Sequence, residues 1–448
     1  MQVSIETLSD LGRRMTIGVP AEKIESQVQL RLQEAARNFS MKGFRKGKVP
    51  VSVIKNRFGR GVRQEVLGEV MSQSYYEAVN QENIRPAGQP RIEAKKLEEG
   101  KDLEFVATFE VYPEITLGDF SSIHVEKKLA EISDKDIDNM IETLRKQKQT
   151  FQELDAASEE GDQLDIDFIG TMNGEKFEGG EARGSRLVLG SKRMIPGFEE
   201  GLLGKRKGEE VKLSLTFPET YHDQDLAGQA VEFAVSINSV ARAQLPELNE
   251  EFFASFDITE GGEQAFRDEV AANMARELNT ARRNNIKNQV LEGLQAIHAI
   301  TVPVALIESE INALRQQAMQ QFGQGSQIDE SMLPADMFRK QAEKRVKLGL
   351  IMSEIVKQKE LKPSAEAVRT LVEEMAESYE DPQEVIKWYY SNKNQLATVE
   401  SMALEEAAVD VVLASAQVNE VHTSYEEALK PSLKPGENAT TSDADADE

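Results

Sequence analysis

The chain has 448 residues, 40% hydrophobic and 29% charged, which is the composition of folded soluble domains. It is long enough for about three domains, and it contains no cysteine, which excludes disulfides and thiolate metal sites. Its four histidines (His124, His222, His298 and His422) form no ligand-spaced pair, so we expect surface or capping histidines, no metal and no cofactor. The formal net charge of -25 opposes nucleic-acid binding by the chain as a whole.

The sequence shows neither a targeting signal nor a membrane span. The opening MQVSIETLSDLGRR lacks the basic run and apolar stretch of a secretory signal. The segment VVLASA near Val411 is too short to cross a bilayer. We therefore expect a cytoplasmic protein with no membrane partner.

Residues 1–112 predict an α/β domain. Two opening strands flank a turn at Ser9–Gly12, and Pro20 starts a helix. A second helix is predicted from near Pro50 through Phe58, before Gly59, and a half-buried strand at 103–111 follows a turn at 99–100. The apolar positions of the first helix recur at helical spacing: Ile24, Val28, Leu32, Ala35 and Phe39.

A basic segment joins these two helices. Between Ala35 and Gln64 there is no acidic residue, and a positive patch on an acidic chain can attract a polyanion locally. The segment contains nine basic residues: Arg37, Lys42, Arg45, Lys46, Lys48, Lys55, Arg57, Arg60 and Arg63.

Residues 113–150 predict a linker followed by a helix. Pro113 and Gly118 mark the linker, and Ser133 with Asp136 predicts a capping box for a helix over 137–148. This segment is too small to fold alone, so we expect it to pack on a part of the chain distant in sequence.

Residues 151–243 predict a β-rich block. Apolar and polar residues alternate at 164–168, 211–217 and 231–237, and Asn173-Gly174 predicts a tight hairpin. A short helix is expected at Pro196–Leu203. Together these features indicate an antiparallel sheet wrapped on a helix.

Residues 244–432 predict an all-helical body, followed by an acidic, disordered tail at 433–448. Ile307, Ile311 and Leu314, with Ala318 and Phe322, form an apolar stripe. Breaks are expected at Pro303, Pro334, Pro363 and Pro382. Flexible apolar side chains suit promiscuous binding, although no individual site is assigned. They are Met319, Phe322, Met332, Leu333, Met337, Phe338 and Met352. The fold class is therefore multidomain α+β.

The loop GFRKGKVP at 43–50 resembles the signature loop of the bacterial trigger factor family, and the order of the blocks follows that family. The resemblance implies docking through Phe44, Arg45 and Lys46 on ribosomal protein and RNA beside the exit tunnel. It also implies that the helical body and the 113–150 segment cradle nascent and unfolded polypeptides. The protein would then be partly ribosome-associated, and a homodimer off the ribosome is left open.

The β-rich block contains Phe168, Phe177-Glu178, the run Met194-Ile195-Pro196-Gly197-Phe198, then Tyr221 and Phe233. Through these residues it resembles an FKBP-type prolyl isomerase. The resemblance implies that its aromatic residues line a pocket for a prolyl ring, that the Ile195 N–H holds the substrate carbonyl and that Tyr221 donates a hydrogen bond. Two positions depart from that family, because Phe198 replaces a tryptophan and Ser185 an aromatic wall residue, which makes the pocket shallower or wider. The site residues carried over are Phe168, Phe177, Glu178, Met194, Ile195, Phe198, Tyr221 and Phe233.

Two alternatives remain beside a ribosome-docked chaperone with an accessory isomerase. A prolyl isomerase alone leaves the residues outside the β-rich block without a role. An RNA-binding or ribosome assembly factor leaves the aromatic pocket unexplained. An envelope chaperone would need a signal peptide. No GxxxxGK[ST] loop is present, so the predicted chaperone works without ATP.

Overall fold

The computed structural model describes residues 2–38, 49–96, 98, 100–172, 174–221, 223–224, 226–322, 333–377, 379 and 381–431. The predicted docking residues Phe44, Arg45 and Lys46 lie outside these ranges, as does the predicted acidic tail at 433–448. The described chain divides into two compact units, one of residues 2–127 and 283–421 and the other of 128–282 and 422–431.

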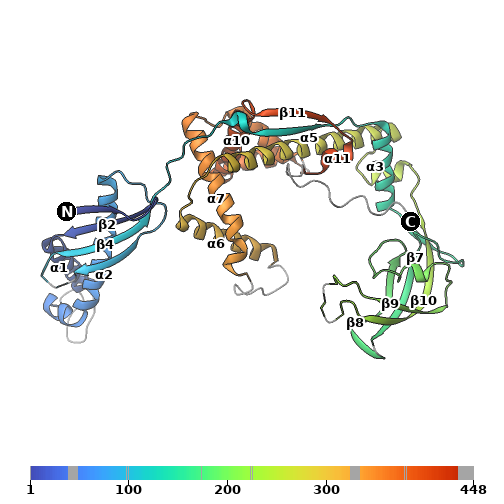
Figure 1. Ribbon diagram of the computed structural model, residues 1–448, viewed down its shortest axis with the longest axis horizontal. Helices are drawn as coiled ribbons and strands as arrows, with labels where there is room; N and C mark the ends of the chain where they lie inside the picture. Colours follow the sequence, from blue (N-terminus) through green and yellow to red (C-terminus); the bar gives the residue numbers. More distant parts are fainter. Residues whose placement is uncertain are drawn as a thin grey trace. The chain divides into compact units, whose positions relative to one another are not determined.

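The first unit opens with a four-stranded antiparallel sheet in the order β1-β2-β4-β3. Its strands are β1 (Gln2–Thr7), β2 (Gly12–Val19), β3 (Arg91–Lys96) and β4 (Leu103–Glu110). Helices α1 (Ala21–Asn38) and α2 (Val51–Gln81) pack on one face of this sheet (Figure 1). The predicted opening strands, turn and first helix are confirmed.

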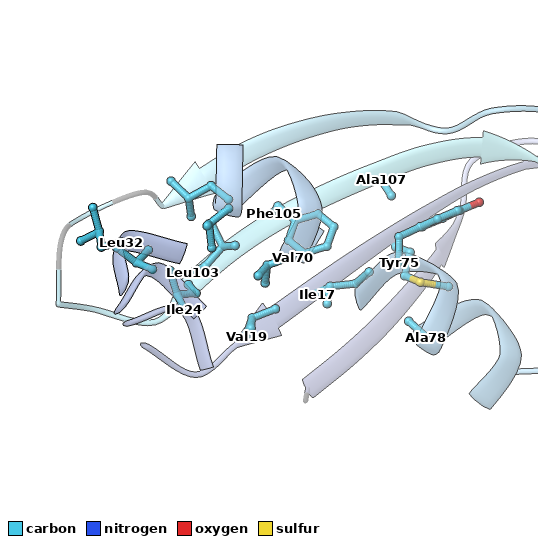
Figure 2. Close-up of a cluster of buried hydrophobic side chains, with 14 of the residues drawn as sticks. Ile17, Val19, Ile24, Leu32, Val70, Tyr75, Ala78, Leu103, Phe105 and Ala107 are labelled. Atoms are coloured by element: carbon cyan, nitrogen blue, oxygen red, sulfur yellow. The ribbon is translucent and has the colours of Figure 1, made fainter. Parts of the chain in front are cut away.

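The core of this domain forms because β2 and β4 bury every second side chain. Figure 2 shows Ile17 of β2, Phe105 of β4 and Val70 of α2 within this core. On α1 the buried face includes Ala36, whereas Ala35 is only half-buried. The sequence did not predict β3, and α2 continues far beyond Gly59, where the predicted helix stopped.

The segment after Tyr112 packs on distant parts of the chain, as predicted. Strand β5 (His124–Leu129) pairs with β11 (Gln417–His422), a strand that was not expected in the helical region. Phe120, Ile123 and Val125 share a core with residues of α5 (Gly262–Ile297) and α7 (Ala335–Gln358). Helix α3 (Asp134–Gln147) begins with the predicted capping box of Ser133 and Asp136.

The β-rich block lies in the second unit and is a five-stranded antiparallel sheet. Long β10 pairs with β7 along one edge and with β9 and β6 along the other, while β8 pairs with β7. The short helix expected at 196–203 is a single 3₁₀ turn, η2 (Glu200–Leu202). The strands are β6 (Thr150–Glu153), β7 (Gln163–Met172), β8 (Glu175–Val188), β9 (Glu210–Thr216) and β10 (Ala230–Gln244).

The rest of the described chain is helical apart from β11 and the connecting loops. The predicted breaks are confirmed, because Pro303 precedes α6, Pro334 caps α7, Pro363 separates α7 from α8 and Pro382 opens α9. No described helix has the length and apolarity needed to cross a membrane. The other helices are α4 (Glu250–Ala254), α6 (Val304–Phe322), α8 (Ala365–Ala376), α9 (Pro382–Ser391), α10 (Lys393–Leu413) and α11 (Tyr425–Leu429).

Two expectations about single side chains can be compared with the structure. His298 is a buried capping histidine and not a surface one, because its Nε2 accepts the Gly118 N–H at 2.9 Å and its Nδ1 lies 2.7 Å from the carbonyl oxygen of Leu294 in the last turn of α5. Among the methionines named as adaptable, none of which was assigned a site and each of which could equally be a core residue, Met352 is part of the core, whereas Met337 is 69% exposed.

Candidate prolyl-binding site

Phenylalanine rings from three segments of the β-rich block meet in one cluster. Phe198 is fully buried, with its ring centroid 5.7 Å from that of Phe168 on β7 and 5.2 Å from that of Phe233 on β10. These rings meet edge to face, an arrangement that adds to the free energy of burial. The cluster therefore forms a rigid apolar floor.

A second set of aromatic rings continues this floor towards the surface. Half-buried Phe177 lies 6.1 Å from Phe233 and 5.9 Å from Phe217, between ring centroids. Tyr221 follows, with its ring centroid 4.7 Å from that of Phe217. The aromatic wall therefore runs without interruption from the buried Phe198 to the half-buried Tyr221.

Two glycines make room for the Phe177 ring. A Cβ on Gly170 would lie 2.7 Å from both the Phe177 and Phe233 rings, and one on Gly180 would lie 2.8 Å from Phe177. Real Cβ atoms do not approach rings this closely, so any side chain at either position would displace the Phe177 ring. The position of Phe177 thus depends on the absence of side chains on β7 and β8.

The loop beside this aromatic wall is held by one buried carboxylate. Glu199 is only 6% exposed, and both of its oxygens accept hydrogen bonds from the loop that leads to Met194 and Ile195. The donors are the backbone N–H groups of Gly190 (2.8 Å), Lys192 (3.1 Å), Arg193 (2.9 Å) and Met194 (3.3 Å), and the Ser191 hydroxyl (3.1 Å).

These contacts determine the charge state of Glu199. Burial is the largest single influence and would raise the pKa of its carboxyl group, but the hydrogen bonds from the loop together hold that pKa below its usual range. The ionised form is therefore the one that this loop stabilises. Lys192 has a φ of +55°, a left-handed conformation that a non-glycine residue adopts only at a cost in free energy.

Comparisons with known proteins place these features in a family. A model of the bacterial trigger factor protein matches residues 1–144, and a model of its C-terminus matches residues 264–414. The chain is 54% identical over 435 residues to the trigger factor of Stutzerimonas stutzeri, covering 97% of this chain and 99% of that one. The chain belongs to the trigger factor family.

A second relative and a third family model agree with that family. Trigger factor from Cellvibrio japonicus is 51% identical over 432 residues, covering 96% of this chain and 99% of that one. A model of FKBP-type peptidyl-prolyl cis-trans isomerases matches residues 155–238, the segment that holds the aromatic cluster. A structure solved in a study of substrate recognition by the trigger factor chaperone covers 92% of this chain and 99% of that one, with a TM-score of 0.48 and 18% identity.

As a trigger factor, the protein is a ribosome-associated chaperone with an FKBP-type prolyl isomerase domain. It acts in the cytoplasm. The predicted family, fold class and enzyme activity are confirmed.

The structure brings most of the predicted isomerase residues of this trigger factor together. Phe168, Phe198 and Phe233 are buried in the same core, against which Phe177, Met194, Ile195 and Tyr221 pack as half-buried neighbours. Glu178 lies on β8, beside Phe177 in sequence. Ser185, where the resemblance to the isomerase family implies an aromatic residue, is also on β8, opposite Ile166 of β7.

Sequence reasoning missed Glu199, the two glycines under Phe177, and Phe217 as a ring of the wall. The only sequence signal for Glu199 was its place directly after Phe198, because a glutamate is by default a solvated residue. Phe217 was predicted as a strand residue, and no spacing rule distinguishes a core ring from a pocket ring.

Proposed function

We propose that the aromatic cluster is the prolyl-binding site of the isomerase domain, with Phe168, Phe177, Glu178, Met194, Ile195, Phe198, Tyr221 and Phe233 as its residues. The observation that carries the proposal is the position of Ile195. It packs against the cluster at the end of the loop that Glu199 holds. Within the described ranges, no group accepts a hydrogen bond from the Ile195 N–H. A substrate carbonyl can therefore take that donor without displacing a partner.

The site would act by binding the twisted amide. Rotation about an X–Pro bond breaks amide resonance, and the twisted state is less dipolar than the planar one. An apolar pocket therefore stabilises the twisted state more than water does, and this differential binding lowers the barrier. The Ile195 N–H and the Tyr221 hydroxyl would orient the substrate backbone. The reaction needs no nucleophile.

Chaperone action would follow from docking. In this proposal Phe44, Arg45 and Lys46 hold the N-terminal domain, residues 1–112, beside the ribosomal exit tunnel. Tethering raises the effective concentration of the helical body, residues 244–432, around the nascent chain. Weak apolar contacts from that body and from the 113–150 segment then delay misfolding without ATP. The isomerase block, 151–243, acts on X–Pro bonds as an accessory.

A homodimer away from the ribosome is part of the same proposal. In the first unit Tyr379, Trp388 and Tyr390 each expose about half of their surface, at 58%, 49% and 47%. Exposed apolar surface of this kind is suited to association. Sedimentation velocity of the free protein at micromolar concentration should show a concentration-dependent dimer, and a single monomeric species at all concentrations would exclude it.

The docking proposal is tested by ribosome co-sedimentation. The wild type should pellet with ribosomes, and Phe44→Ala/Arg45→Ala/Lys46→Ala should stay in the supernatant. A matched triple variant on the exposed edge strand β3, Arg91→Ala/Glu93→Ala/Lys95→Ala, should pellet like the wild type. Equal pelleting of the loop variant and the wild type would contradict docking through this loop.

The isomerase site is tested with Phe177→Ala in a proline-peptide assay. Loss of this wall should lower kcat/KM by about tenfold or more, since about 1.4 kcal/mol of transition-state stabilisation corresponds to a factor of ten. Tyr390→Ala, an exposed aromatic residue on α9, is the control and should keep full activity. An unchanged kcat/KM for Phe177→Ala would refute the assignment of the aromatic cluster as the prolyl-binding site.

A further inference from the structure

The first four turns of α2 expose a surface of hydrogen-bond donors. Asn56, Arg57, Arg60 and Gln64 are all exposed. Positions three and four apart are neighbours on a helix, so Arg60 lies beside each of the other three. We call these four residues the donor face of α2. No acidic residue occurs on α2 before Glu65.

The cations of this face are not neutralised by the rest of the described chain. Arg57 and Arg60 form no ion pair with any described residue, and the Arg57 guanidinium lies 5.7 Å from the centroid of the Phe58 ring. Arg37 of α1 and Lys55 of α2 likewise pair with no described acidic residue, whereas three other cations of α1 and α2 are paired. Lys23 pairs with Glu77 at 3.1 Å, Arg31 with Glu65 and Glu69, and Arg63 with Glu25 at 2.6 Å.

It is unexpected that Arg57 and Arg60 pair with no described acidic residue, because the chain carries 78 acidic against 53 basic residues. In a chain with so many carboxylates, unpaired arginines that are three residues apart keep a concentrated positive charge. They also keep their guanidinium donors available for a partner.

We propose that the donor face of α2 binds the phosphate–sugar backbone of ribosomal RNA. This proposal rests on the proposed docking function and adds a contact surface separate from the 43–50 loop. Arginine, asparagine and glutamine are typical donors to phosphate and sugar oxygens. Protein–protein interfaces, by contrast, normally have an apolar and aromatic core, which these four side chains do not supply. Binding of this kind carries no base specificity.

Salt dependence gives the test. The full-length variant Arg57→Gln/Arg60→Gln removes two charges and keeps side-chain length and helix propensity. Its matched control is Arg91→Gln/Lys95→Gln on β3, which removes the same charge from the sheet edge of the same domain. Binding of a labelled ribosome and of a labelled A-form RNA hairpin is measured by fluorescence anisotropy from about 0.05 to 0.2 M salt, the range over which phosphate contacts lose affinity steeply.

Loss of two phosphate contacts should reduce the slope of log K against log salt by about 1.8, or 0.9 per contact. The ribosome affinity of the donor-face variant should fall by about tenfold or more at moderate salt. The control should match the wild type in both respects. An unchanged slope and affinity on ribosomes would overturn the proposal.

Binding to the RNA hairpin distinguishes an RNA partner of the donor face from an acidic protein partner. Weaker ribosome binding by the variant together with no hairpin binding by the wild type would show that the donor face contacts protein, which overturns the RNA assignment. If the wild type itself does not bind ribosomes, the docking proposal is refuted separately from the proposal for the donor face. Hairpin binding that depends on Arg57 and Arg60 would in that case still support RNA recognition by α2.

Discussion

Removal of the Glu199 carboxylate should release the loop of residues 190–195, which belongs to the proposed prolyl-binding site, from its fixed conformation. Glu199→Ala deletes the acceptor of four backbone N–H bonds and one hydroxyl bond. A net hydrogen bond contributes about 0.5–1.5 kcal/mol, and a buried donor left without a partner costs about 1–3 kcal/mol. Water can reach part of this loop, so we expect a loss of about 2–4 kcal/mol, below the simple sum.

The loss should appear in activity as well as in stability. Once released, the loop no longer fixes Met194 and the Ile195 N–H against the aromatic wall. We expect kcat/KM for a proline peptide to fall by about tenfold, mainly in kcat, because orientation is lost in the transition state. Glu200→Ala is the matched control, since the exposed Glu200 accepts only the Gly197 N–H, at 2.9 Å, among the described bonds. Its effect on both quantities should be small.

The assay for stability must report on the isomerase block itself. The single tryptophan, Trp388, lies in the other unit and does not report on it. Hydrogen exchange of the amides in β7 and β10 is therefore the measurement of choice. If Glu199→Ala exchanges like the wild type and keeps full kcat/KM, the inference that this carboxylate holds the loop is wrong.

The pH dependence follows from the sign of the pKa shift. Because the folded-state pKa of Glu199 lies below its ordinary value, the unfolded chain binds the proton more readily. The stabilising contribution of Glu199 is thus fully present above the ordinary glutamate pKa of about 4.3. It is lost as the pH falls through the lower, folded-state pKa. The difference in hydrogen exchange between wild type and Glu199→Gln should therefore shrink only in acid.

Three further changes test the packing. Gly61→Ala should stabilise α2 by about 0.5–1 kcal/mol in urea unfolding, because the new methyl group meets no atom within 4 Å and alanine is the better helix former; destabilisation would contradict this. Gly170→Ala should lower isomerase activity, since its Cβ would collide with the Phe177 and Phe233 rings; unchanged kcat/KM would mean that the rings adapt freely. Asp162→Asn should speed exchange in β7 at neutral pH and have less effect in acid: burial would raise the pKa of Asp162, but the Arg242 side chain and the Glu159 N–H hold it low. Equal exchange at neutral pH would refute that role.

The sequence predicted elements well wherever solvent and core alternate. On β4 the buried Phe105 and Ala107 alternate with half-buried Glu104 and Val106, and that pattern is visible in the residues themselves. Helix α2 was underestimated because glycine has low helix propensity. Tertiary burial of Ile54, Val66 and Val70 outweighs that cost, and no local rule can weigh it.

The residues of the candidate prolyl-binding site show the same limit of sequence-based prediction, which is that tertiary contacts cannot be read from local patterns. Its aromatic residues could be predicted because aromatic side chains carry a recognisable family pattern. Glu199 could not, because its role comes from the fold of the neighbouring loop and not from its spacing. The same holds for Gly170, whose function is to leave space for a ring that another strand supplies.

The uneven distribution of charge along the chain bears on how the protein would approach RNA. A net charge of -25 repels RNA from most of the surface, so the rest of the chain would not compete with the basic segment of residues 35–64 for a phosphate backbone. Arg57 and Arg60, which pair with no described acidic residue, would gain specificity from this contrast, because approach by the basic segment of residues 35–64 is electrostatically favoured. Each charge removed from the donor face should therefore weaken docking, whereas removal of acidic residues from the body should add poorly oriented RNA binding. In the proposed docking, electrostatic repulsion elsewhere on the chain would orient the protein, so that a small number of cations could direct an acidic protein to an RNA surface.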